Sequence, residues 1–166
     1  MDLKEIYNKI YDILEHHIQL NKEAMCSLQA LGFNGFKKLH KCFAEHLFCN
    51  ELKLISVLYK ISKEKVNIKP RTGIHLEYSP MSLKEHLIKW NAEIETAIQE
   101  LGELNKEHFN SVGYSNDIIE CLINDLLDYH CKIQCWYQRG ETSDWLAHDL
   151  FVIDAGIKEE YHGNKR

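Results

Sequence analysis

Residues 36–61 form the stretch that most constrains how this chain can fold. They contain no glycine or proline and place apolar side chains three and four residues apart, which is the spacing of a buried helical face. The apolar positions are Phe36, Leu39, Phe43, Leu47, Leu54, Leu58 and Ile61. Asn50 and Glu51 stand in the middle of this face. A carboxylate on a packing face is costly unless it is paired or binds a metal, so Glu51 either has a functional partner or lies at a solvated edge of the stripe.

Helical segments of this kind account for most of the chain. Its 166 residues are 45% hydrophobic and include only 8 glycines and 2 prolines. That length is enough for one sizeable core, and the scarcity of helix breakers predicts a single all-α domain. We expect helices at about 3–30, 36–61, 82–109, 117–139 and 143–158.

Signals between these segments predict how the helices are connected. The turn sequence at 32–35 predicts that the first two helices run antiparallel. Ser82 and Glu85 form a capping box for the third helix, and Gly140 is expected to end the fourth. The only long connection joins the second helix to the third and is long enough to travel the height of a bundle. The sequence therefore predicts a four-helix bundle with one long crossover and a short fifth helix.

Charge and composition exclude several classes of partner. The net charge is −5 and neither end carries a basic arm, which argues against nucleic acid. No apolar run is long enough to span a membrane and no signal-peptide core follows the charged start, so we expect a cytoplasmic protein with no membrane partner. The six cysteines lack the spacing of a disulfide framework and are expected to be reduced. Ten histidines are a hint of metal handling.

Four short motifs, in this order and spacing, resemble the ferritin family. The segment Gly32-Phe-Asn-Gly-Phe-Lys-Lys38 is similar to the turn between the first two ferritin helices. Glu51-Leu-Lys-Leu54 stands where the family has Glu-x-x-His, and Val66-Asn-Ile68 resembles the strand-like start of its long loop. His148 to Asp154 is similar to the fifth ferritin helix. The resemblance implies a ferritin-like four-helix bundle that assembles into a homo-oligomeric cage of twenty-four subunits.

The resemblance also implies chemistry with ferrous iron. Ferritins hold two iron ions with carboxylates and histidines from all four helices, because hard iron prefers oxygen and imidazole ligands. Most of these positions are changed here. Counting from the turn, the family's ligands fall at His17, at Leu54 beside the retained Glu51, near Asn91, and near Leu126 and Tyr129.

A weakened centre is therefore expected in place of a complete one. At most, Glu51, His17 and His130 would hold one non-haem iron ion, with Glu51 and His17 as the catalytic residues of a weak ferroxidase. No haem is expected, because Leu52 stands where bacterioferritin has its haem-binding methionine.

A second group of candidate ligands is offset from the core stripe. Cys42, His46 and Cys49 are spaced by four and three residues, so they share one helix face with Glu45 beside them. The resemblance implies that this face looks into the cage cavity. Thiolate and imidazole suit zinc or copper, whereas Glu45 and His46 alone could take iron; the alternative is a polar lining with unreactive thiols. For oxidation at the cavity surface, Glu45, His46, Cys49 and Asp128 would attract a second ion.

Two packing contacts are expected from this layout. Glu51 and His17 should face each other across the first two helices, as a hydrogen-bonded pair or as ligands of one cation. The fifth helix should bury Leu150, Phe151 and Ile153 against symmetry mates, since a short amphipathic helix is not stable alone.

Three functions follow from these features. The leading one is an iron-storage subunit of a ferritin-like cage with an atypical oxidation site, and the second is a non-catalytic scaffold that keeps the shell without the chemistry. The third is a Dps-like DNA-protecting mini-ferritin, suggested by the Leu-His-x-x-Phe element around His40. The acidic residues that should follow that element are replaced by Ile55 and Tyr59, and a basic tail is lacking, which argues against this third function.

Overall fold

The computed structural model of the chain describes residues 1–62 and 82–161. This part is helical, without strands, and its helices are α1 (Leu3–Ala30), α2 (Asn34–Ser62), α3 (Leu83–Val112), α4 (Asp117–Thr142) and α5 (Ala147–Glu160). For the described residues, the prediction of an all-α fold is confirmed. The predicted strand-like segment at 66–68 lies outside the described residues.

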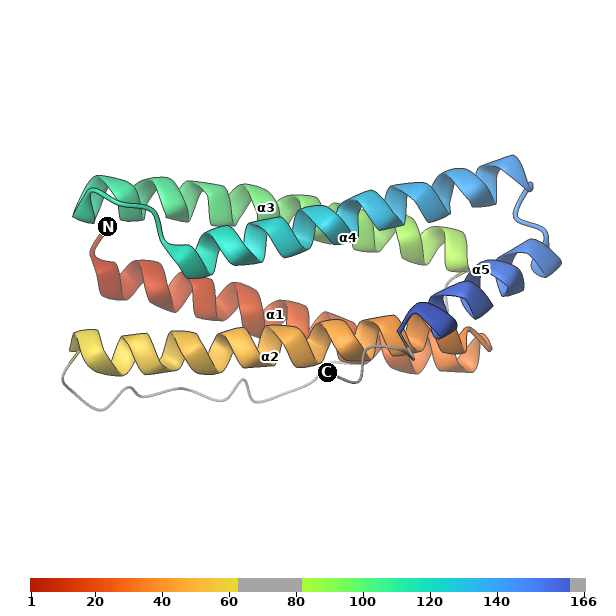
Figure 1. Cartoon of the computed structure of the whole chain (residues 1–166), viewed down its shortest axis with the longest axis horizontal. Coiled ribbons are helices and arrows are strands. Elements are labelled where there is room, and N and C mark those ends of the chain that lie inside the picture. Colours follow the sequence, from red (N-terminus) through yellow and green to blue (C-terminus); the bar gives the residue numbers. More distant parts are fainter. Residues whose placement is uncertain (63–81, 162–166) are drawn as a thin grey trace.

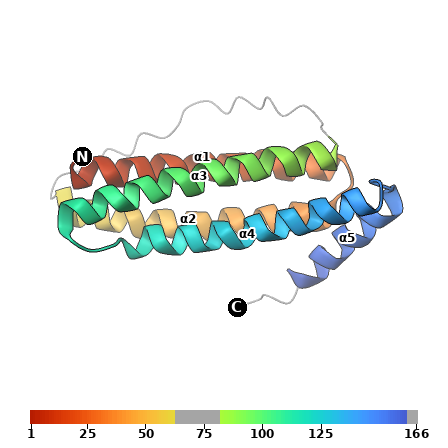
Figure 2. The same ribbon diagram turned by 90° about the horizontal axis from the view of Figure 1, so that it is seen from above.

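The four long helices lie side by side along one axis, and the short α5 crosses one end of them obliquely (Figures 1 and 2). α1 and α2 run in opposite directions, as do α3 and α4, whereas α2 and α3 run in the same direction (Figure 1). Ser62 and Leu83 therefore lie at opposite ends of the bundle, which is the separation that the long connection between them allows.

Each long helix buries one apolar stripe along the axis of the bundle. On α2 this stripe includes Phe36, Phe43 and Leu54, none of which is accessible to solvent. Glu51 is also buried, with 4% of its surface exposed. The interpretation of Glu51 as a solvated edge residue is therefore wrong.

The helix ends follow the local signals in the sequence. Gly32, with φ of 85°, follows the last turn of α1, and a left-handed backbone of this kind favours glycine. The capping box of α3 is present: Ser82 Oγ accepts a hydrogen bond from the Glu85 amide at 3.2 Å, and the Ser82 amide donates to Glu85 Oε2 at 2.8 Å.

The junction between α4 and α5 differs from the prediction at Gly140. Gly140 lies inside α4, which continues to Thr142, and α5 begins at Ala147 instead of 143. Asp144 and Trp145 have left-handed backbones, with φ of 51° and 56°, so a helix cannot begin there. The Trp145 ring then covers Gly140 so closely that an added Cβ would lie 2.5 Å from it. Gly140 is thus a packing residue and does not end the helix.

α5 is held against the beginning of α2 by Asp154. The buried carboxylate accepts hydrogen bonds from the amides of Gly35 at 2.9 Å and Phe36 at 2.8 Å. Phe33, which precedes α2, has no side-chain acceptor with which to cap the helix, so Asp154 supplies the acceptor from another helix.

The apolar side of α5 packs within the same chain. Ile153 is buried in the monomer, so the expectation that symmetry mates bury it is wrong for this residue. Phe151 stacks on Phe33 with ring centroids 5.3 Å apart and remains half exposed. The helix does not need a partner chain for its inner face because the N-terminal end of α2 already covers that face.

Candidate functional site

The first polar group of the bundle interior is centred on Glu51. Its carboxyl group lies beside the side chains of Tyr11 and Glu15, both on α1 and one helical turn apart. Burial first, and then the contact with Glu15, raise the pKa of Glu51 to about 7, while the Tyr11 hydroxyl acts in the opposite direction. Two neighbouring carboxylates repel each other, so this arrangement favours a proton on Glu51, with a phenol beside it.

Sequence reasoning did not identify Glu15 or Tyr11 as partners of Glu51. Their spacing of four residues was visible, but it does not say which side of α1 turns toward α2. The expected partner, His17, lies in different surroundings.

His17 is buried between α1 and α3, with 4% of its surface exposed. It lines a groove that also contains His16 and Glu93, and its Nδ1 atom has no hydrogen-bond partner in the structure. Burial, followed by the neighbouring His16, lowers the pKa of His17 to about 4. The imidazole is therefore neutral at physiological pH.

A second polar group links three helices through a chain of hydrogen bonds. Asn21 Nδ2 donates to the His17 carbonyl oxygen at 2.7 Å, which leaves Asn21 Oδ1 as an acceptor 2.7 Å from His40 Nδ1. His40 Nδ1 must then carry the proton, and His40 Nε2 must accept from His86 Nε2 at 2.9 Å. The pattern fixes the tautomers of both imidazoles and joins α1, α2 and α3.

Both imidazoles of this chain are neutral. Burial, followed by the adjacent His86, holds the pKa of His40 well below its usual range. Burial, followed by Lys89, lowers the pKa of His86 to about 4. His40, the residue that suggested a Dps-like element, is thus an internal hydrogen-bonding residue with no surface exposed.

A third polar group lies at the opposite end of the bundle. His108 Nδ1 donates to the Tyr114 carbonyl at 3.1 Å, so its Nε2 is the acceptor for the Tyr7 hydroxyl at 3.4 Å. Asn116 Nδ2 donates to the Tyr7 oxygen at 2.7 Å, while Asn116 Oδ1 caps the beginning of α4. These contacts satisfy the buried groups and anchor the α3–α4 turn to α1, which is a structural role.

The other predicted ligands are partly or fully exposed, and most have separate partners. Hydrogen bonds join His130 to Glu95 (2.9 Å) and His46 to Asp125 (2.6 Å), and ion pairs join Glu45 to Lys41 (3.8 Å) and Asp128 to Lys132 (3.4 Å). Cys49 is an exposed free thiol. His130 therefore pairs with α3 and is not part of the group around Glu51. Within residues 1–62 and 82–161, no three His, Cys, Asp or Glu side chains are arranged to hold a metal ion.

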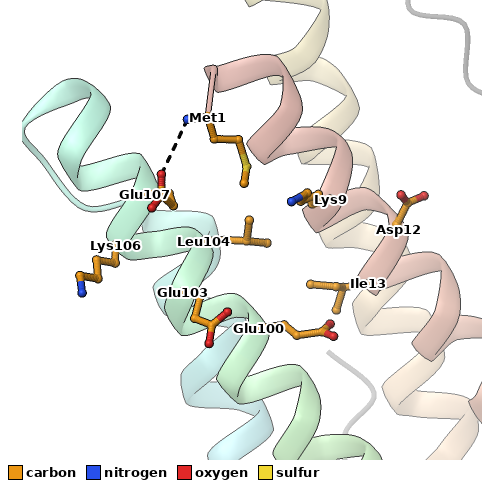
Figure 3. Close-up of a pocket in the computed structure, with 9 residues that line it drawn as sticks. All are labelled: Met1, Lys9, Asp12, Ile13, Glu100, Glu103, Leu104, Lys106 and Glu107. Carbon is orange, nitrogen blue, oxygen red and sulfur yellow. Dashed lines mark ion pairs between the residues drawn. The ribbon is translucent and has the colours of Figure 1, made fainter.

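A groove of about 680 Å³ lies between α1 and α3 near the N-terminus (Figure 3). It contains side chains of both charges together with Ile13 and Leu104, and the N-terminal ammonium pairs with Glu107 at 3.8 Å. None of the predicted metal ligands lines it. Its mixture of charges does not indicate one class of ligand.

Compared with known proteins, the sequence matches no protein-family model and no curated protein. None of the described helices is both long and apolar enough to cross a lipid bilayer. Function is therefore inferred from the arrangement of the helices and from the polar groups they enclose.

Proposed function

We propose that this chain is a ferritin-like subunit of a homo-oligomeric cage, which binds ferrous iron inside the bundle and oxidises it slowly. The directions of the helices support the fold part of this proposal. Two antiparallel pairs, with α2 and α3 parallel and joined by one long connection, follow the one-crossover plan of ferritin-like bundles (Figure 1). The short α5 at one end agrees with the same plan.

The carboxyl pair of Glu15 and Glu51 is the observation that carries the iron proposal. Carboxyl oxygens of Glu15 and Glu51 and the Tyr11 hydroxyl converge from α1 and α2, where Glu51 is buried and the other two side chains are half-buried. Hard oxygen donors suit iron, and a cation between two carboxylates can replace the proton that Glu51 otherwise carries. Ferrous iron is the substrate here, and Glu51 with Glu15 would bind it.

The same geometry accounts for slow oxidation. One ferrous ion gives up one electron, whereas efficient reduction of dioxygen takes two or more. His17 and His130 lie apart from the carboxyl pair in different contacts, so they do not complete a two-ion centre. A second electron must come from another ion, such as one on the mineral surface.

Exposed apolar side chains support assembly with other copies. On α2, Phe48, Leu52 and Tyr59 are spaced by four and seven residues and are about half exposed, so they form one apolar strip on the outside of the bundle. On α5, Phe151 and Val152 are exposed to a similar degree. Contiguous apolar surface of this kind is typical of protein contacts.

A non-catalytic scaffold is the second candidate. It is favoured by the lack of any three-ligand group within the described part of the chain and by the separate hydrogen-bond partners of His46 and His130. This candidate requires the same fold and assembly but no iron oxidation.

One experiment separates the two candidates. Ferrous iron is added in air to the purified protein, to Glu51→Gln and Glu15→Gln, and to a control, Glu103→Gln, which changes an exposed carboxylate on α3. Iron storage predicts a soluble amber product above the buffer rate, slower in the first two variants and unchanged in the control. Oxidation at the buffer rate in all four proteins would favour the scaffold, and the particle mass would test the expected twenty-four subunits.

A further inference from the structure

The seam between α2 and α4 brings together three side chains of metal-binding type. His46 Nε2 on α2 lies 2.6 Å from Asp125 Oδ2 on α4. Cys121 Sγ, one turn earlier on α4, lies 4.0 Å from the same Asp125 oxygen. One carboxylate oxygen is thus contacted by an imidazole from one helix and a thiol from the other.

The register of the two helices adds Cys49 to this group. α2 and α4 run in opposite directions (Figure 1). One turn after His46 on α2 is Cys49, and one turn before Asp125 on α4 is Cys121. Because the helices are antiparallel, both cysteines lie on the same side of the His46–Asp125 contact along the seam. The Phe43 and Tyr129 rings, with centroids 4.1 Å apart, show the same pairing one turn in the other direction.

We propose that His46, Cys49, Cys121 and Asp125 bind one zinc-class divalent cation and thereby link α2 to α4. Two thiolates, one imidazole and one carboxylate are the ligand types of tetrahedral zinc sites, and they are softer than the oxygen donors that iron prefers. This site goes beyond the proposed iron function, because it uses other residues and another class of metal. Of the ligands predicted on this face, it includes His46 and Cys49 and leaves Glu45 and Asp128 to their lysine partners.

Metal binding at these residues requires the His46–Asp125 hydrogen bond to open. At 2.6 Å, His46 and Asp125 are hydrogen-bonded. Two ligands of one tetrahedral zinc ion, each about 2.0 Å from the metal, lie roughly 3.3 Å apart. The pair must therefore separate by about 0.7 Å. Such a movement is available to side chains that are 48% and 34% exposed, as these are.

Cobalt(II) is a suitable probe for this site, since thiolate ligands give it charge-transfer absorption and tetrahedral geometry gives it intense visible bands. The full chain, under a non-thiol reductant that excludes disulfides, is titrated with cobalt(II), which is then displaced with zinc. We expect one thiolate-bound cobalt ion per chain, seen as thiolate absorption, and an increase in melting temperature on zinc binding.

Single substitutions identify the ligands. Cys49→Ser, Cys121→Ser and His46→Gln should each weaken cobalt binding by more than about tenfold, because even partners outside the coordination sphere cost that much. Cys131→Ser is the matched control, since it removes an exposed thiol of α4 outside the seam, and it should bind as the wild type does. Circular dichroism verifies that each variant is helical.

Two results would overturn the proposal: no thiolate–cobalt absorption in the wild type, or equal affinity in wild type and Cys121→Ser. The outcome is independent of the iron proposal. Glu51→Gln should leave the thiolate–cobalt absorption unchanged, and Cys121→Ser should leave the rate of iron oxidation unchanged.

Discussion

Asp154 and Gly35 form a contact that fixes α5 on the rest of the molecule. The carboxylate caps α2 through the Gly35 amide, and the Asp154 backbone approaches the Gly35 Cα so closely that a Cβ there would collide with the Asp154 carbonyl oxygen. The glycine is required by this approach and not by its backbone angles. The fifth helix is therefore part of the folding unit of the monomer as well as a candidate assembly element.

Asp154→Ala should destabilise the protein by about 1–2 kcal/mol, because the first amides of α2 lose their acceptor and remain near an apolar interface. Gly35→Ala should also loosen α5, since the two backbones must separate. Urea unfolding measures the loss, and limited proteolysis detects release of α5. Glu159→Ala, which changes an exposed carboxylate on the same helix, should behave as the wild type. Unchanged unfolding of Asp154→Ala would show that the cap contributes nothing.

The buried imidazole chain predicts a loss of stability in acid. The pKa of His86 is about 4 in the folded state and 6.5 as the ordinary value, so the unfolded chain binds more protons between these limits. The stabilisation is fully present above pH 6.5 and is lost as the pH falls toward 4. The contribution of neutral His86 to the free energy of unfolding is on the order of 3 kcal/mol.

Urea unfolding from pH 7 to pH 4 measures this dependence. His86→Gln retains a donor for His40 Nε2 but cannot take up a proton, so the slope should become shallower in this variant. His148→Gln changes an exposed histidine on α5 and serves as the control. An equal slope in wild type and His86→Gln would mean that the chain does not sense acid.

The sequence was sufficient for features that depend on neighbouring residues. The stripe on α2, the left-handed Gly32 and the Ser82 capping box each depend on residues within a few positions of one another. Sequence reasoning failed at Gly140, because the ring that covers it belongs to Trp145, and the position of Trp145 depends on two left-handed residues that no local rule predicts.

The candidate site was harder to predict because its residues belong to different helices. Residues two positions apart on a helix point about 200° apart around its axis, so the rotation of α1 decides whether Glu15 or His17 turns toward Glu51. Counting from the turn favoured His17, whereas the structure places Glu15 there. The contact of His46 with Asp125 likewise depends on the register of α2 against α4. These helices are not consecutive in the chain, so no local sequence rule fixes that register.

The raised pKa of Glu51 should change stability with pH in the opposite direction from the histidines. Its pKa is raised to about 7 in the folded state from an ordinary value of 4.5, so the folded chain binds the additional proton between these limits. This stabilisation is present below pH 4.5 and is lost as the pH rises through 7. Glu51→Gln should therefore gain stability relative to the wild type between pH 5 and pH 8. Unfolding in the presence of a chelator measures the difference, and the same difference at both pH values would contradict the proton on Glu51.

Iron kinetics provide the last prediction. A partial site on two helices should oxidise iron much more slowly than a complete two-ion centre. Glu51→Ala should reduce the initial rate only in part, because surface carboxylates and growing mineral continue the reaction. Stopped-flow absorbance with increasing iron per chain measures both. Fast oxidation that saturates at two irons per chain and disappears in Glu51→Ala would show a complete centre. In that case, ligands from α3 and α4 must move to Glu51 when iron binds, since His130 pairs with Glu95 in the present structure.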